Sequence, residues 1–258
     1  MQRTAGAKGN HSNGDRMSSP RIRLFLRQQG RRLLTRLDKT RAFSRLSFSQ
    51  SGEDLIVDYI FQARGVDSPT YVDIGAYHPW LISNTALFYK RGSRGINIEP
   101  NPLLFREIAA ERPMDINLNI GLSDKEGELD FFVMTPAHLS TFVKQNAEKY
   151  VREHSYVIEK VAKIKVDTLR HILEQHFSGT CPDYLSIDTE GLDITVLSSV
   201  DFDTFKPKVI CVETTTYSKT GHGQKETETT RFLESKGYLL YADTYINSIF
   251  VLRNFWVR

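Results

Sequence analysis

Short apolar runs alternate with longer stretches of helical periodicity from residue 47 onward. Five of these runs are predicted to be buried strands: Tyr71–Ala76, Gly95–Glu99, Ile116–Ile120, Tyr184–Asp188 and Val209–Glu213. Helices are predicted between them, near Ser83–Lys90, Pro102–Arg112, Leu192–Val200 and Glu226–Lys236. Strands that alternate with helices in this way are typical of an α/β domain, in which each helix crosses back over a largely parallel sheet.

The end of the chain and one internal segment break this alternation. The last two apolar runs, Tyr238–Ala242 and Ser248–Leu252, are separated by only five residues. Because a parallel crossover needs about a dozen residues or more, these runs must form an antiparallel hairpin. At about residues 127–167, a strand (Leu129–Met134), a charged helical stretch and another strand (Lys163–Val166) interrupt the pattern. Ligands of open α/β sheets bind outside the carboxyl ends of the strands, so this insertion is expected to cover a substrate.

The first 46 residues differ from the rest of the chain in composition and charge. Residues 1–20 are rich in Gly, Ser, Asn and Arg and are expected to be disordered, whereas residues 21–46 place Leu and Ile at helical spacing among many Arg. Residues 1–45 hold 12 Lys and Arg against two Asp, a net charge of +10, and the remainder has a net charge of −7. Residues 21–46 could contact an anionic membrane or nucleic acid, but a solvated arm or a helix packed on its own domain is the simpler interpretation.

Cysteine content and hydropathy bear on the compartment. Cys181 and Cys211 show no metal-ligand spacing, and two cysteines are too few to staple a domain of this size, which favours a reducing environment. No run of about 18 apolar residues is present to span a bilayer, and residues 1–20 lack the apolar core of a secretory signal. The expected location is therefore cytoplasmic.

The segment YVDIGAYHP, residues 71–79, joins a buried strand to a loop with a single glycine. Gly75 allows the backbone to approach a ligand, and Asp73 could orient polar groups of that ligand. Glu99 ends the next strand, 24 residues after Gly75, where a carboxylate can accept both hydroxyls of a ribose. A dinucleotide site would need a Gly-x-Gly-x-x-Gly loop, so a nucleoside without phosphates, such as S-adenosylmethionine, fits better. A nicotinamide-dependent oxidoreductase is the weakest interpretation for the same reason.

Three acidic residues are expected at the carboxyl ends of the fourth and fifth strands. Asp188 and Glu190 are separated by one residue, and Glu213 ends the neighbouring strand. Close carboxylates are costly unless they are used, as a general base, as ligands of a divalent metal, or as a contact for the amino group of a cofactor. The alternative is that the first two only stabilise a helix N-terminus. His78 is a further candidate base, and the alternative for it is a structural role. His138 is a candidate substrate contact, and the alternative for it is a position in a surface loop.

Several motifs occur in the order in which one enzyme family carries them. They are FSQSGEDL (Phe48–Leu55), YVDIGAYHPWLISNT (from Tyr71), GINIEPNP (from Gly95), NIGLSD (Asn119–Asp124), VDTL (Val166–Leu169) and IDTEG (Ile187–Gly191). From about Phe48 to Phe250 the chain resembles the FkbM family of S-adenosylmethionine-dependent methyltransferases. The resemblance implies a Rossmann-like class I methyltransferase sheet, mostly parallel with a C-terminal antiparallel hairpin. It also implies an O-methyltransferase that acts on a hydroxyl, often of a sugar, glycolipid or polyketide-derived acceptor.

The resemblance also implies roles for individual residues. Seven residues would form the cofactor site: Asp73, Gly75, Tyr77, Glu99, Leu122, Ser123 and Gln50. Within this set, Asp73 and Gly75 would hold the methionine end and Glu99 the ribose, and Leu122 and Ser123 would lie near the adenine. Asp188 and Glu190 would face the reaction, with Glu213 and His138 toward the substrate. Many members carry Gly-Ala-Asn and a second glycine where this chain has Gly-Ala-Tyr-His-Pro, so the contact of that asparagine is not carried over.

A second hypothesis from a different class stays open at this point. The domain could bind its cofactor as a scaffold, and the basic arm could recruit it to a membrane or to nucleic acid. A divalent metal is supported only by the clustered carboxylates, and the sequence names neither the acceptor nor the oligomeric state.

Overall fold

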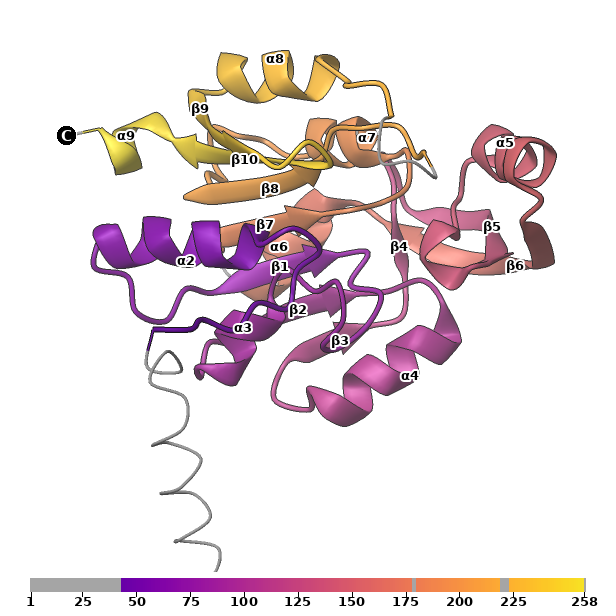
Figure 1. Ribbon diagram of the computed structural model, residues 1–258, viewed down its shortest axis with the longest axis horizontal. Helices are drawn as coiled ribbons and strands as arrows, with labels where there is room; N and C mark the ends of the chain where they lie inside the picture. Colours follow the sequence, from indigo (N-terminus) through magenta and orange to yellow (C-terminus); the bar gives the residue numbers. More distant parts are fainter. Residues whose placement is uncertain (1–42, 178–179, 219–222, 258) are drawn as a thin grey trace, which may run out of the picture. The chain divides into compact units, whose positions relative to one another are not determined.

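The computed structural model describes residues 43–177, 180–218 and 223–257, and its central feature is a seven-stranded sheet (Figure 1). The strands are β1 (Tyr71–Ile74), β2 (Gly95–Ile98), β3 (Ile116–Leu118), β7 (Tyr184–Ile187), β8 (Val209–Glu213), β9 (Tyr238–Asp243) and β10 (Asn247–Leu252). Their order across the sheet is β3-β2-β1-β7-β8-β10-β9. Neighbouring strands are parallel except where β10 pairs, because β10 runs antiparallel to both β8 and β9.

Helices cover both faces of this sheet. In chain order they are α2 (Glu53–Ala63), α3 (Ala86–Lys90), α4 (Pro102–Glu111), α6 (Leu169–Phe177), α7 (Asp193–Ser198), α8 (Glu228–Ser235) and α9 (Arg253–Trp256). Apolar residues of α2, α3 and α9 pack on one face, and those of α6, α7 and α8 pack on the other. In Figure 1, α2 and α3 lie on the near face of the sheet and α6 on the far face.

Burial on both faces explains why the central strands are mainly apolar, with Asp73 of β1 and Ser186 of β7 as buried polar exceptions. All four residues of β1 and all four of β7 are buried. Successive side chains of a strand point to opposite faces, so Tyr71 enters the layer under α2 whereas Val72 and Ile74 enter the layer under α6 and α7. A strand with helices on both sides favours apolar residues at every position rather than at alternate ones.

The expected α/β architecture is confirmed, with differences at the edges. The five predicted parallel strands and the C-terminal hairpin are present, but the link in the hairpin is three residues long, 244–246, instead of five. The last strand of the chain, β10, lies between β8 and β9. Three α-helices were not predicted: α2, which lies before β1, α6, which precedes the link to β7, and α9, which follows β10.

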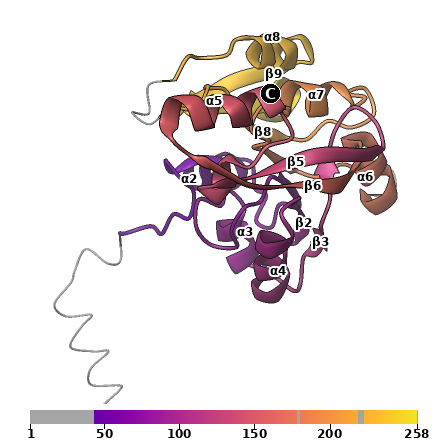
Figure 2. The ribbon, with the colours of Figure 1, turned by 90° about the vertical axis from the view of Figure 1, so that its right-hand side faces the viewer.

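The residues for which an insertion was expected form a long hairpin and a helix. Strand β5 (Gly127–Thr135) pairs antiparallel with β6 (Val157–Asp167), and the two strands lie side by side in Figure 2. Between them come the short 3-10 helix η2 (Ala137–Leu139) and α5 (Lys144–His154). The strand expected to end at Ile120 stops at Leu118, and β4 (Gly121–Leu122) instead pairs with β6 in a second, three-stranded sheet. The chain thus changes sheets within the NIGLSD motif.

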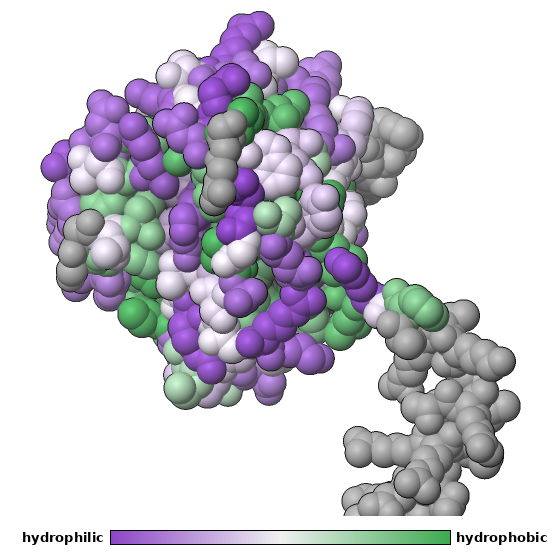
Figure 3. Space-filling view, turned by 90° about the vertical axis from the view of Figure 1, so that its left-hand side faces the viewer, coloured by the Kyte–Doolittle hydropathy of each residue, from purple (hydrophilic) through white to green (hydrophobic). Residues whose placement is uncertain are grey.

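The predicted basic arm, residues 1–46, lies outside the described residues except for its last four. Within the described part of the chain, no helix has the length and apolar character needed to cross a membrane. The side of the domain shown in Figure 3 is mainly hydrophilic, and its apolar residues appear as separate areas.

A buried polar network ties β1 to the segment between α4 and β3. The side chains of Arg112 and Asp115 are both 0% exposed and form an ion pair of 2.9 Å. The guanidinium also donates to the hydroxyls of Tyr71 (2.9 Å) and Thr85 (3.0 Å). Thr85 in turn donates to the carboxylate of Asp73 at 2.5 Å. The network therefore joins one guanidinium to two buried carboxylates, directly at Asp115 and through the Thr85 hydroxyl at Asp73.

Replacing Arg112 with alanine is expected to lower the free energy of unfolding by about 3–5 kcal/mol, because Asp115 would be left buried without its partner. Urea unfolding followed by circular dichroism measures this change. Arg106→Ala, at an exposed position of α4, is the matched control and should change stability by less than about 0.5 kcal/mol. Equal effects of the two substitutions would contradict the assigned role.

Candidate active site

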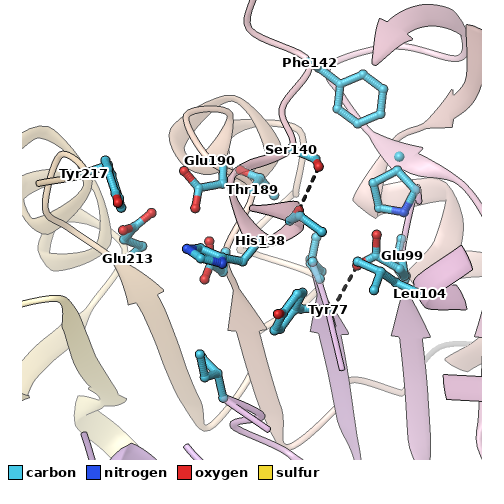
Figure 4. Close-up of a pocket in the computed structure, with 18 of the residues that line it drawn as sticks. Tyr77, Glu99, Leu104, His138, Ser140, Phe142, Thr189, Glu190, Glu213 and Tyr217 are labelled. Carbon is cyan, nitrogen blue, oxygen red and sulfur yellow. Dashed lines mark hydrogen bonds between the residues drawn. The ribbon is translucent and has the colours of Figure 1, made fainter. Parts of the chain in front are cut away.

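A pocket of about 400 Å³ opens at the carboxyl ends of β1, β2, β7 and β8. This volume lies in the range of small-molecule sites. Its walls come from the loops that follow these strands and from the insertion, which contributes His138, Ser140 and Phe142. Figure 4 shows Glu99 and Leu104 at one end of the pocket, Glu190, Glu213 and Tyr217 at the other, and Tyr77 and His138 between them.

The loop after β1 is held in one conformation by its neighbours. Gly75 has a φ of 75°, in the left-handed region, and a Cβ there would lie 1.7 Å from the carbonyl oxygen of Asp188. The backbone N–H groups of Gly75 and Ala76 both donate to the carbonyl of Ile98, at 3.0 and 3.2 Å. Only glycine satisfies both the dihedral angle and the close approach. The loops after β1 and β7 are therefore packed against each other with no space for a side chain.

Glu99 lies just past the end of β2, with its carboxylate in the pocket. It accepts hydrogen bonds from the backbone N–H groups of Tyr77 (2.9 Å) and Asn101 (2.7 Å). Burial raises the pKa of Glu99 to about 7, although these two hydrogen bonds oppose the increase. The carboxylate is thus fixed in orientation and is poised between its neutral and charged forms near neutral pH.

Asp188, Glu190 and Glu213 form a carboxylate cluster at the other end of the pocket. One oxygen of each lies within 4.8 Å of those of the other two. Burial, followed by repulsion from Asp193, raises the pKa of Asp188 to about 7. Burial and mutual repulsion also raise the pKa values of Glu190 and Glu213 well above their usual range. The three carboxylates therefore do not all ionise together near neutral pH, and one of them can stay charged and accept a proton from a bound molecule.

Among the residues that the structure describes, two groups of side chains have donor atoms close enough to bind a divalent cation. One is the carboxylate cluster, and the other is Glu126, Asp167 and His171 at the end of the second sheet. The His171 ring nitrogen lies 3.0 Å from Asp167, so an ion pair already accounts for the second group. At each group, a metal is favoured only by the proximity of these donor atoms.

His138 and Tyr77 separate the two acidic ends of the pocket. Their rings meet edge to face, with centroids 5.9 Å apart. Burial lowers the pKa of His138, so its imidazole is neutral at pH 7. Tyr77 has a φ of 54°, which is unusual for a residue with a side chain. The tyrosine that replaces the expected asparagine therefore forms part of the pocket wall.

Three predicted site residues do not line the pocket. Asp73 is 4% exposed and bonds to Thr85, behind the loop after β1. Ser123 is buried, and its N–H donates to the carbonyl of Asp167 at 2.9 Å. His78 accepts the N–H groups of Trp80 (3.1 Å) and Leu81 (2.9 Å) through Nδ1, which closes a turn. The structure thus gives these three side chains contacts within the protein beside the pocket, and their predicted roles in the site stay predictions.

The remaining predicted residues do line the pocket, and so do several that sequence reasoning missed. The predicted ones are Gln50, Gly75, Tyr77, Glu99, Leu122, His138, Asp188, Glu190 and Glu213. The missed ones include Ile82, Leu104, Ser140, Phe142, Thr215 and Tyr217. The position of Tyr217 in the pocket could have been predicted from the sequence, because this residue follows β8 at the edge of the sheet where ligands bind.

The FSQSGEDL motif explains how Gln50 reaches the pocket. The carboxylate of Asp54, on the first turn of α2, accepts the hydroxyls of Ser47 (2.7 Å) and Ser49 (2.9 Å) and the N–H of Phe48 (2.7 Å). These bonds fold residues 47–54 into a turn, and Gln50 lies at its tip beside the pocket.

The sheet order, with an antiparallel strand inserted before the last parallel one, defines an α/β fold of the class I methyltransferase type. The family model described as Methyltransferase FkbM domain matches residues 73–240. The chain therefore belongs to the FkbM methyltransferase family and is a methyltransferase that uses S-adenosylmethionine. No protein with a curated description matched the sequence.

Solved structures with similar backbones are also methyltransferases. One is a TehB-like SAM-dependent methyltransferase from Corynebacterium glutamicum, with 11% identity, 87% of this chain and 98% of that chain covered, and a TM-score of 0.41. Another is the methyltransferase domain of bacterial CtHen1, with 11% identity, 79% and 99% coverage, and a TM-score of 0.37. At these identities and TM-scores, the family assignment rests on the sequence match.

Gly75→Ala is expected to destabilise the protein by more than about 2 kcal/mol, because strain from the positive φ is added to the clash with Asp188. Gly65→Ala is a matched control: Gly65 has a φ of 69°, but nothing lies within 4 Å of an added Cβ. The control should lose only about 1 kcal/mol. Denaturant unfolding of both variants compares them, and equal losses would show that the close approach costs nothing.

Proposed function

We propose that the protein transfers the methyl group of S-adenosylmethionine to a hydroxyl of a small-molecule, sugar or glycolipid acceptor. The observation that carries this proposal is the pocket with two acidic ends, Glu99 at one and the carboxylate cluster at the other. A nucleoside needs a hydrogen-bond acceptor for its ribose, and an acceptor hydroxyl needs a group that takes its proton. The two ends of this one pocket supply these two functions.

The cofactor half of the pocket suits a nucleoside. The Glu99 carboxylate would accept the ribose hydroxyls, since each oxygen bonded to a backbone N–H keeps a further lone pair. Leu104, Leu122 and Phe142 offer apolar surface for an adenine. Gly75, Tyr77 and Gln50 would surround the methionine end, with Asp73 and Ser123 supporting this site from behind. The single glycine of the loop gives no cradle for a pyrophosphate.

The carboxylate cluster would receive the proton of the acceptor. S-adenosylmethionine, when bound, supplies a methyl group on a sulfonium sulfur, which keeps the bonding electron pair as the methyl leaves. Asp188 or Glu190 would take the hydroxyl proton as the acceptor oxygen forms its bond to the methyl carbon. Glu213 and His138 would orient the acceptor, and much of the rate would come from alignment. We assign no step to His78, because its Nδ1 is already engaged by two N–H groups.

The compartment proposed for this activity is the cytoplasm. Cys181 and Cys211 are both free, as expected of a protein that works under reducing conditions.

Glu99→Gln is expected to weaken binding of S-adenosylmethionine at least about tenfold, because an amide nitrogen cannot accept the hydrogen bonds now made to one carboxylate oxygen. Isothermal titration calorimetry measures the dissociation constant. Glu107→Gln, at an exposed site on the neighbouring helix α4, is the control and should bind as the wild type does. Undiminished binding by Glu99→Gln would remove Glu99 from the cofactor site.

Binding should also depend on pH with a predictable sign. The pKa of Glu99 is about 7, above its usual value, so the carboxylate is mostly protonated below pH 7 and loses one acceptor oxygen. Affinity for S-adenosylmethionine is therefore expected to fall as the pH drops from 8 to 6, by up to about tenfold. In Glu99→Gln the part of this dependence that Glu99 causes should vanish. An identical pH profile in the wild type and the variant would argue against the assignment.

The acceptor is tested by methyl transfer from labelled S-adenosylmethionine to a panel of hydroxylated sugars and lipids, with the matching deoxy or O-methylated compounds as controls. Glu190→Gln should lower the turnover rate at least about a hundredfold while leaving cofactor binding within about threefold. Transfer that continues to the O-methylated controls would place the methyl group on an atom other than the hydroxyl oxygen.

A further inference from the structure

Glu190 has a backbone conformation that its own sequence does not favour. Its φ is 52°, in the left-handed region, and the φ of the next residue, Gly191, is 112°. A residue with a side chain adopts the left-handed region only at a cost, so neighbouring contacts must hold it there. Because Glu190 follows β7 at the acidic end of the pocket, this conformation decides where its carboxylate points.

Three side chains of the insertion make these contacts. The hydroxyl of Thr141 (3.0 Å) and the amide of Asn146 (3.1 Å) both donate to the backbone carbonyl of Glu190. The hydroxyl of Tyr150 donates to Oε2 of the same residue at 3.0 Å. The insertion thus binds the backbone and the side chain of one residue 40 to 49 positions further along the chain.

The three donors are themselves held in place. Asn146 and Tyr150 are four residues apart on α5, so they lie on the same face of this helix. Thr141 is fully buried, and its backbone exchanges two hydrogen bonds with Phe132 of β5. Its hydroxyl also accepts the N–H of Val143 at 2.9 Å, next to the start of α5. The donors therefore belong to one ordered surface.

The contact between this surface and the loop after β7 is close. A Cβ on Gly191 would lie 2.6 Å from the amide nitrogen of Asn146. On its other side the loop is held by Asp193, whose carboxylate accepts the N–H groups of Thr189 (3.1 Å) and Gly191 (3.4 Å). Asp193 fixes the N–H groups of the loop, whereas the carbonyl and the carboxylate of Glu190 are bonded by the insertion.

We propose that the insertion is the positioning element for Glu190, with Thr141, Asn146 and Tyr150 holding this residue in its left-handed conformation at the acidic end of the pocket. The functional consequence rests on the proposed function, in which Glu190 is a candidate base. The insertion then does more than cover the acceptor: it sets the direction and the proton affinity of a carboxylate supplied by the sheet.

Several titratable groups face Glu190 and influence its protonation. They are Asp188, Asp193, Glu213, Tyr217, Tyr150 and His138. Burial raises the pKa of Glu190, repulsion from Asp188 adds to the increase, and the hydrogen bond from Tyr150 opposes it. Burial also raises the pKa of Tyr150, so its hydroxyl stays protonated and remains a donor. Removing this donor should therefore raise the pKa of Glu190 further.

The first test measures this titration directly. In protein labelled with ¹³C at glutamate carboxyl groups, the resonance of Glu190 is assigned by its loss in Glu190→Gln and is followed against pH. Tyr150→Phe is expected to raise its midpoint by about one pH unit. Tyr59→Phe is the control, because this tyrosine is exposed on α2. An unchanged midpoint in Tyr150→Phe, or the same shift in both variants, would overturn the proposal.

The second test measures how firmly the loop is held. Asn146→Ala is expected to speed hydrogen exchange in a peptide covering residues 188–193 about fivefold, as measured by mass spectrometry. Gln145→Ala, at the exposed neighbouring position of α5, should leave this exchange unchanged. Equal exchange in the two variants would show that Asp193 alone fixes the loop. Neither test needs cofactor or acceptor. Failure of methyl transfer would therefore refute the proposed function, whereas the positioning proposal is decided by these two tests alone.

Discussion

The pocket depends on the contact between the loops that follow β1 and β7. Gly75 meets the carbonyl of Asp188 so closely that a Cβ would lie 1.7 Å from that oxygen. The N–H of Asp188 donates to the carbonyl of Ile74 at 2.9 Å, which extends the parallel pairing to the last residue before the glycine. This contact sets the separation between the loop that bonds to Glu99 and the loop that carries Asp188 and Glu190. The two acidic ends of the pocket are therefore placed by backbone geometry before any side chain contributes.

The domain buries acidic side chains in two different environments, one beside a cation and one at the pocket. Asp115 lies beside Arg112, which compensates its charge and makes the pair part of the framework. At the pocket, Glu99 accepts two backbone N–H groups and Glu190 accepts the hydroxyl of Tyr150, and the pKa values of Glu99 and of the three clustered acids are raised. Compensated acids stabilise the fold, whereas uncompensated ones remain available to a ligand or a proton. Asp73 is intermediate between the two groups: it accepts a hydrogen bond from Thr85 behind the pocket, yet burial raises its pKa as it does that of Glu99.

Local patterns in the sequence predicted most of the fold and part of the pocket lining. Buried strands between helices are recognisable from continuous apolar runs, and residues at strand ends, such as Glu99 and Glu213, follow from them. Helix α2 was missed although Ile56, Val57, Ile60 and Phe61 have helical spacing, because the segment was considered only as a motif. The contacts of Thr141, Asn146 and Tyr150 could not be predicted, since they depend on how the insertion folds over a loop 40 to 49 residues away. The side-chain direction of Asp73 also could not be predicted: its position at the strand end follows from the apolar run, but its bond to Thr85 depends on the packing around β1.

Native mass spectrometry of the purified protein tests the central claim, that this pocket holds a nucleoside methyl donor, most directly. The account predicts a bound species with the mass of S-adenosylmethionine or S-adenosylhomocysteine, retained by the wild type and by Glu107→Gln but lost from Glu99→Gln. A protein that carries a dinucleotide instead, or that stays ligand-free when S-adenosylmethionine is added, would contradict it.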